Sequence, residues 1–109
     1  MKIHCRCGAT IHDGSDSLPN KAHLIPDSNR FDLWDQLDAL IDAVADHTVG
    51  REDAYNLARQ LFRVQRPIWQ CAECGRLHLD DRHDRRKLHT FRPEDGTVVT
   101  DALAAAPRH

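Results

Sequence analysis

Four cysteines in two close pairs constrain the fold of this chain more than any other feature of its sequence. Cys5 and Cys7 lie in the segment C-R-C-G, whereas Cys71 and Cys74 lie in C-A-E-C-G. The chain has no other cysteine. Structural zinc sites hold the ion in a tetrahedron of four thiolate or imidazole ligands. The two pairs therefore predict one structural zinc ion bound by all four sulfurs, which joins two distant parts of the chain.

A glycine follows each cysteine pair directly. A segment that presents two sulfurs to one ion folds back on itself, and the residue after the second cysteine often takes a positive φ. Glycine adopts such a φ without a clash because it has no Cβ atom. Gly8 and Gly75 occupy these two positions. We therefore expect two metal-binding turns, called here the first knuckle (residues 5–8) and the second knuckle (residues 71–75).

Other uses of the four cysteines are open at this point. Disulfides are typical of secreted proteins, but the chain starts with Met1-Lys2-Ile3-His4 and shows no signal peptide. A redox C-x-x-C site leaves the C-R-C pair unexplained. Iron held by four thiolates, as in rubredoxin-like electron transfer, is chemically possible, although the first pair lacks the usual spacing. Zinc and a cytoplasmic location are the favoured interpretation.

The size and charge of the chain bound its class and its partners. A chain of 109 residues with a mean hydropathy of -0.62 is typical of one soluble domain, residues 1–109, with no membrane partner. Its formal net charge is -2. Residues 1–50 carry four basic and eight acidic side chains, whereas residues 51–109 carry eleven basic and nine acidic ones. This asymmetry bears on the partners of the protein rather than on its fold.

Short strands are expected near both knuckles and helices between them. Residues 1–12 predict two strands around the first knuckle, and residues 67–92 predict three strands around and after the second. Residues 18–26 predict an ordered loop in which Leu24 is buried. The tail, residues 93–109, is expected to be flexible, with a short extended segment at Val98-Val99 and a weak helix at its alanine-rich end.

Two helices are expected in the middle of the chain. The first begins at Asp27 or Ser28 and stops at Gly50, and the second runs from about Arg51 to Gln65, before Pro67. Each shows apolar residues at helical spacing on one side. These are Leu33, Leu37, Leu40, Ile41 and Val44 in the first helix and Ala54, Leu57, Ala58, Leu61 and Phe62 in the second. A short connection predicts an antiparallel helical hairpin.

The knuckle and strand segments, residues 1–12 and 67–92, resemble a zinc ribbon. That resemblance implies a small antiparallel β platform around one zinc ion and binding to nucleic acid or protein. This chain departs from the pattern by inserting a helical hairpin at about residues 28–65. We therefore predict an α+β fold, a zinc-ribbon-like β platform with an inserted two-helix hairpin.

The first helix also carries a row of aspartates, called here the acidic row. Its members are Asp32, Asp35, Asp38, Asp42 and Asp46. At 3.6 residues per turn they fall within an arc of roughly 120°, nearly opposite the apolar stripe. A solvated face is one interpretation, and pairing with Arg59, Arg63 and Arg66 is another. The functional interpretation is a docking surface for a protein partner with a basic surface, as in an inhibitor or immunity protein.

A basic run follows the second knuckle. Arg82, Arg85, Arg86 and Lys87 are interrupted by Asp84 and preceded by Asp80-Asp81. A charged turn is the simplest interpretation. The alternative is contact with nucleic acid, in which Arg92 would assist and Trp69 or Phe91 would stack on bases.

No sequence motif indicates an enzyme. The chain has no glycine-rich phosphate loop and no nucleophile motif. Four cysteines fill all four positions of the predicted zinc site, which leaves none for a catalytic water. The prediction is a non-enzymatic protein-interaction module, with a nucleic-acid-binding zinc ribbon as the first alternative and electron transfer as the second.

Overall fold

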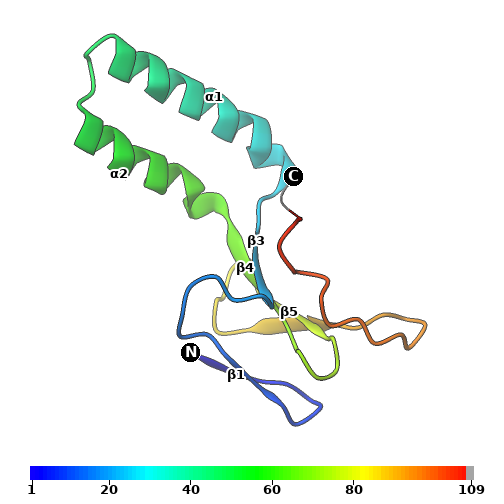
Figure 1. The fold of residues 1–109 in the computed structure, drawn as a ribbon. Coiled ribbons are helices and arrows are strands. Elements are labelled where there is room, and N and C mark those ends of the chain that lie inside the picture. The colour runs from blue at the N-terminus through cyan, green and yellow to red at the C-terminus, as the bar shows by residue number, and fades with distance from the viewer. Residues whose placement is uncertain (108–109) are drawn as a thin grey trace. The chain divides into compact units, whose positions relative to one another are not determined.

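The chain divides into two compact units. The computed structural model describes residues 1–107 and assigns Met1–His23 and the chain from Pro67 onward to one unit, called here the β unit. Leu24–Arg66 form the second, called here the helical unit. The predicted α+β class is confirmed, because the chain forms two α-helices and two antiparallel sheets (Figure 1).

The β unit holds both sheets apart from Leu24 and Arg66, the end residues of β3 and β4. Strands β1 (Lys2–His4) and β2 (Thr10–His12) pair antiparallel around the first knuckle, with Ile3 opposite Ile11. The second sheet has the order β3-β4-β5-β6. Its strands are β3 (Lys21–Leu24), β4 (Arg66–Gln70), β5 (Leu77–Asp80) and β6 (Leu88–Phe91). The strands expected at both knuckles therefore form, and β4 leads into the second knuckle while β5 leaves it.

Strand β3 was not expected. The interpretation of residues 18–26 as a loop is wrong for this part, and Leu24 is 39% exposed rather than buried. Strand β3 lies beside β4, and the backbone N–H of Gln70 donates to the carbonyl of Asn20 at 2.8 Å. This pairing joins segments about 50 residues apart, so the local sequence contains no signal for it.

The core of the β unit is small and includes the metal-binding segments. Its buried cluster contains Ile3, Ile11 and Trp69 together with Cys5 and Cys71. The alternation of strand side chains places Ile3 and Ile11 on the buried side. Because two of the five core residues are cysteines, the same side chains form the core and the candidate metal site.

A charged network stabilises the N-terminal part of the β unit. The carboxylate of Asp13 accepts hydrogen bonds from the ammonium of Lys21 at 2.7 Å and from the indole N–H of Trp69 at 3.0 Å. Lys21 also lies 5.7 Å from the centre of the Trp69 ring. The bonds from Lys21 and Trp69 hold the pKa of Asp13 below its usual range.

The buried side chain of Gln70 anchors the C-terminal tail. Its amide N–H groups donate to the carbonyls of Gly75 at 3.1 Å and Val99 at 2.8 Å, and its oxygen accepts from the N–H of Ala102 at 2.9 Å. Gln70 therefore links the tail to the second knuckle. The structure shows neither a strand at Val98-Val99 nor a helix over residues 103–106. The end of the predicted flexible tail, residues 108–109, lies outside the described residues.

The helical unit contains α1 (Asp27–Ala45), α2 (Arg51–Leu61) and a short 3-10 turn, η1 (Phe62–Val64). Helix α1 ends five residues before Gly50, where it was expected to stop. His47 takes a φ of 60°, and the Thr48 hydroxyl and N–H both bond to the Ala43 carbonyl. This local capping ends the helix before the glycine. In residues 1–107, neither helix has the length and apolar character that a membrane crossing needs.

The hairpin buries little of its apolar surface. Within the helical unit, all of which the structure describes, Leu33 is the one buried residue. Other members of the predicted stripes are partly buried, but Ile41 is 66% exposed and Leu57 and Phe62 are also exposed. Large side chains beside the stripes, Phe31, Trp34 and Tyr55, are each more than half exposed. The hairpin therefore presents an apolar surface to solvent.

We predict that Asp13→Asn lowers the free energy of unfolding by about 1–2 kcal/mol at neutral pH, because it removes an ionic hydrogen bond at a mostly buried site. The stabilisation from an ionised Asp13 is present above the pKa of aspartate in the unfolded chain. It is lost as the pH falls through the lowered pKa of the folded protein. Urea unfolding across this pH range should show the difference between the two proteins narrowing toward acid. Asp16→Asn, at an exposed position, is the matched control, and an equal effect of both variants would contradict the prediction.

Candidate functional site

A backbone hydrogen bond closes each knuckle, across three residues in the first and four in the second. In the first, the N–H of Gly8 donates to the carbonyl of Cys5 at 3.0 Å. In the second, the N–H of Gly75 donates to the carbonyl of Cys71 at 2.9 Å. Gly8 has a φ of 96° and Gly75 a φ of 81°, as expected from the glycine after each pair. The turns bring the two cysteines of each pair to the same side of the chain.

The four cysteine sulfurs converge at one point in the β unit. All four Sγ atoms lie within 4.8 Å of one another. The Sγ atoms of Cys5 and Cys74 are 3.5 Å apart, and those of Cys7 and Cys71 are 3.6 Å apart. A tetrahedron with metal–sulfur distances of 2.3 Å has sulfurs about 3.8 Å apart, whereas a disulfide bond is about 2.0 Å long. The donor set therefore fits one metal ion bound by four thiolates.

Burial and hydrogen bonds to sulfur act in opposite directions on the thiolate form that a metal requires. Burial raises the pKa of Cys5 to about 12, although the N–H of Cys7 opposes this by bonding to its sulfur. Burial also acts against ionisation of Cys74, but hydrogen bonds from the backbone and side chain of Arg76 outweigh it and lower the pKa of Cys74 to about 6. A bound cation would ionise the buried thiols as well, and release their protons on binding.

Histidines do not join the sulfur cluster within the described part of the chain. The Nδ1 atom of His4 pairs with the Thr10 hydroxyl at 3.4 Å, and that of His78 pairs with the Thr90 hydroxyl at 3.1 Å. His78 is buried and its Nε2 atom has no hydrogen-bond partner. Burial and the nearby Arg76 lower the pKa of His78, so its neutral form is favoured. Cys7 is the exposed member of the cluster, while Cys5 and Cys71 are buried.

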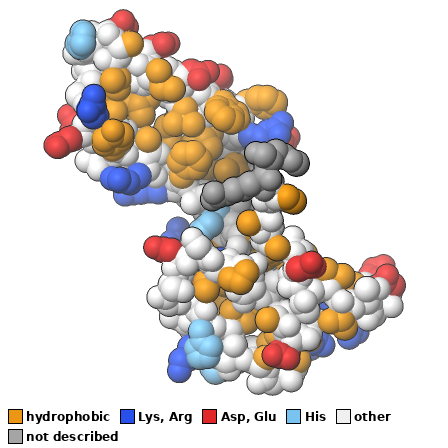
Figure 2. Space-filling view, viewed as in Figure 1, with side chains coloured by type: hydrophobic (Ala, Val, Ile, Leu, Met, Phe, Trp, Pro, Cys, Tyr) orange, Lys and Arg blue, Asp and Glu red, His pale blue; other side chains and the backbone are white. Residues whose placement is uncertain are grey.

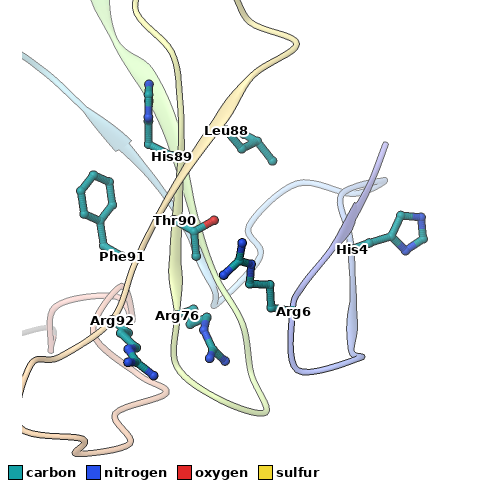
Figure 3. Close-up of a pocket in the computed structure, with 8 residues that line it drawn as sticks. All are labelled: His4, Arg6, Arg76, Leu88, His89, Thr90, Phe91 and Arg92. Atoms are coloured by element: carbon teal, nitrogen blue, oxygen red, sulfur yellow. The ribbon is translucent and has the colours of Figure 1, made fainter.

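A basic groove of about 700 Å³ lies on the β unit beside the second knuckle. Arg6 comes from the first knuckle, Arg76 follows the second, and Arg92 follows β6, so three separate segments contribute a guanidinium group (Figure 3). No carboxylate lines the groove among the described residues. Figure 3 shows the side chain of His4 directed away from the three arginines. The sequence signal for this groove is an arginine inside or next to each knuckle, Arg6 and Arg76.

The basic run predicted as a nucleic-acid contact is a compact charged turn. Arg86 pairs with the carboxylate of Asp84 at 3.3 Å. The carboxylate of Asp81 accepts from the N–H groups of His83 and Asp84 and pairs with His89 at 2.8 Å. These bonds lower the pKa of Asp81 to about 2, with the His89 bond as the main cause. Arg82, Arg85, Arg86 and Lys87 are all exposed, and they do not line the basic groove.

The aromatic residues named for base stacking differ in exposure. Trp69 is 3% exposed and belongs to the core, so stacking of Trp69 on a base is ruled out. Phe91 is 54% exposed and lines the basic groove. Strand β6 thus places Phe91 next to Arg92 at the groove, whereas β4 turns Trp69 inward.

All five members of the acidic row are exposed, on α1 or directly after it. Asp32 accepts a hydrogen bond from Gln36 at 2.7 Å. Arg59 donates to Asn56, and among the described residues no ion pair joins Arg59 or Arg63 to the row. The sequence suggested that arginines of the same chain neutralise the acidic row. In the structure, Arg59 and Arg63 do not do so.

The comparison with protein families gives a match over most of the chain. A family model described as a domain of unknown function, DUF8617, matches residues 1–95. The chain belongs to the DUF8617 family. The match includes both knuckles and the whole helical hairpin. Neither a curated protein nor a solved structure matches the chain.

The two knuckle glycines should respond differently to substitution. A Cβ atom at Gly75 would clash with the carbonyl oxygen of Val99, whereas one at Gly8 meets nothing within 4 Å. We predict that Gly8→Ala costs about 1–2 kcal/mol, from its positive φ alone. Gly75→Ala should cost several times more and weaken metal binding, measured by competition with a chromophoric chelator. Equal losses in the two variants would show that the contact between Gly75 and Val99 does not form.

Proposed function

We propose that this protein is a non-enzymatic interaction module in which one zinc ion fixes the β unit and the helical hairpin binds a protein partner. The observation that carries the proposal is the exposure of large apolar side chains on a hairpin whose one buried residue is Leu33. Exposed apolar patches rimmed by polar residues are typical of protein-binding sites. Figure 2 shows apolar side chains gathered over both helices of the hairpin.

Zinc is the metal that the donor set supports best. Four thiolates at tetrahedral spacing select zinc or iron over hard cations. A structural zinc site contributes about 10–16 kcal/mol in zinc-finger peptides, which exceeds the net stability of many domains. That contribution matters here because the apolar core of the β unit is small. Metal analysis and a visible spectrum of fresh protein separate zinc, which is colourless, from the rubredoxin-like alternative.

The acidic row defines the chemistry of the proposed partner. Five exposed aspartates lie on α1 or directly after it, with Asp38 at the edge of the row next to Trp34 and Ile41, and α1 carries a single basic residue, Arg30. Such a surface complements a protein with an apolar strip beside basic residues, and the charges speed association and give specificity. An inhibitor or immunity protein that covers the phosphate-binding surface of a nuclease needs such an acidic and apolar surface. This is the class of role that we propose.

We predict that reversing Asp35, Asp38 and Asp42 to lysine weakens capture of the partner from native-host lysate by at least about tenfold, because like charges then meet across the interface. Mass spectrometry identifies the captured protein, and binding to the purified partner gives the affinity. A control with the same change in net charge reverses Asp16, Glu94 and Asp101, which are exposed and outside the hairpin. Equal capture by both variants would remove the acidic row from the proposal.

A second candidate function is nucleic-acid binding by the basic groove. Arg6 and Arg92 are exposed and, within the described residues, have no carboxylate partner. Arg76 is engaged with the sulfur of Cys74, so Arg6 and Arg92 are the two cations available to phosphate groups. This places the proposed contact at the groove rather than at the basic run.

We predict that Arg6→Ala with Arg92→Ala weakens binding to single-stranded RNA or DNA and reduces the salt dependence by about two phosphate contacts. Fluorescence anisotropy at several salt concentrations measures both quantities. Arg85→Ala with Arg86→Ala, which removes the same charge from the basic run, is the matched control. A larger loss in the control would return the contact to the basic run, and no binding by the unaltered protein would eliminate this function.

A further inference from the structure

Four of the exposed apolar residues of the hairpin form two pairs at matching heights. Ile41 lies four residues before the end of α1 at Ala45, and Tyr55 lies four residues after the start of α2 at Arg51. At 1.5 Å per residue, both are about 6 Å from the connecting end of the hairpin. Trp34 and Phe62 lie eleven residues from the same two ends, at about 16 Å.

These four residues lie on one face of the hairpin. On α1, Trp34 and Ile41 lie about 80° further round the helix than the stripe centred on Leu33 and Leu37. In the second helix, Tyr55 of α2 and Phe62, which directly follows α2 and begins η1, lie about 80° beyond the stripe formed by Ala54, Ala58 and Leu61. The two helices run antiparallel (Figure 1), so equal rotations in the chain direction lead to the same side. Figure 2 shows apolar side chains over both helices on the side in view.

The size of this face fits a dimer interface. Trp34 is 60% exposed, Ile41 66%, Tyr55 57% and Phe62 37%. With side-chain areas of about 200 Å² each, the four expose about 440 Å², against about 800 Å² buried per partner in a standard interface. Polar residues along the two rims can supply the remainder, so the apolar face is the right size for the centre of such an interface.

Charges at the rim of this face are complementary between the two helices. Asp38 on α1 and Arg59 on α2 are each rotated about 130° around the helix axis from the apolar stripe of their helix. Along the axis, Asp38 lies about 10 Å and Arg59 about 12 Å from the connecting end. They occupy opposite outer edges of the same hairpin, and Arg59 bonds to Asn56 instead. A second copy rotated about an axis parallel to the helices would place Arg59 of the partner subunit beside Asp38.

We propose that the hairpin docks on the hairpin of a second copy of this chain to form a four-helix bundle. In this arrangement α1 faces α2 of the partner subunit at equal height. Trp34 then meets Phe62 of the partner subunit, and Ile41 meets Tyr55 of the partner subunit. A two-fold axis perpendicular to the helices is the alternative. It would pack α1 against α1 of the partner subunit and bring the two acidic rows together, and charge repulsion disfavours this arrangement. Closed two-fold dimers are the commonest protein oligomers.

The inference rests on the proposed function, since both use the hairpin as a docking surface, and the first experiment measures self-association alone. Light scattering and sedimentation of purified, metal-loaded protein should show a concentration-dependent dimer. Trp34→Glu should abolish the dimer while metal content and helix content stay unchanged. A monomer at every accessible concentration overturns the inference, and so does a dimer that Trp34→Glu leaves intact.

A charge exchange tests the arrangement without altering the apolar face. Asp38→Arg and Arg59→Asp, each alone, place like charges together twice per dimer and should raise the dimer dissociation constant by about tenfold or more. The two changes combined in one chain should restore it. Failure of the combined variant to restore the dimer overturns the pairing of α1 with α2. If the protein does not self-associate but still captures a different protein, the dimer inference is wrong and the proposed function is retained.

Discussion

The convergence of four cysteine sulfurs is the constraint on which the rest of the β unit depends. Each knuckle sits between two strands, so bringing the knuckles together also brings β1 and β2 next to the turn between β4 and β5. The buried cysteines then complete an apolar core that has few other members. Without charge compensation four thiolates would repel one another, and the bonds from backbone N–H groups and Arg76 to sulfur reduce that repulsion.

Contacts around the second knuckle extend this organisation to the tail. Gln70 bonds to Gly75 in the knuckle and to Val99 and Ala102 beyond it. The missing Cβ of Gly75 makes room for the Val99 carbonyl. One buried amide and one glycine therefore order a segment whose composition suggests disorder.

Local sequence patterns predicted the elements, and their limits have physical causes. The cysteine spacing and the glycines at positive φ belong to short segments, so the knuckles and the strands beside them were predictable. Strand β3 depends on pairing with β4, and the tail depends on Gln70, and both contacts are distant in sequence. Helical spacing identified the apolar stripes of α1 and α2, but this pattern does not show what fraction of each stripe other parts of the protein bury. The groove could not be predicted because Arg6, Arg76 and Arg92 come from three segments that are distant in sequence and line one groove only in the folded β unit.

Strands β3 and β4 are neighbours in one sheet, and the helical unit begins where β3 ends and finishes where β4 begins. In the topology of the sheet, the whole hairpin is therefore a single long connection between the adjacent strands β3 and β4. The entropy of closing such a connection grows only slowly with its length. Helices of different length or surface chemistry can thus be exchanged at this point while the knuckles and the sheet keep their structure. The architecture separates a base that contains the four-cysteine cluster from an inserted hairpin that is free to diverge.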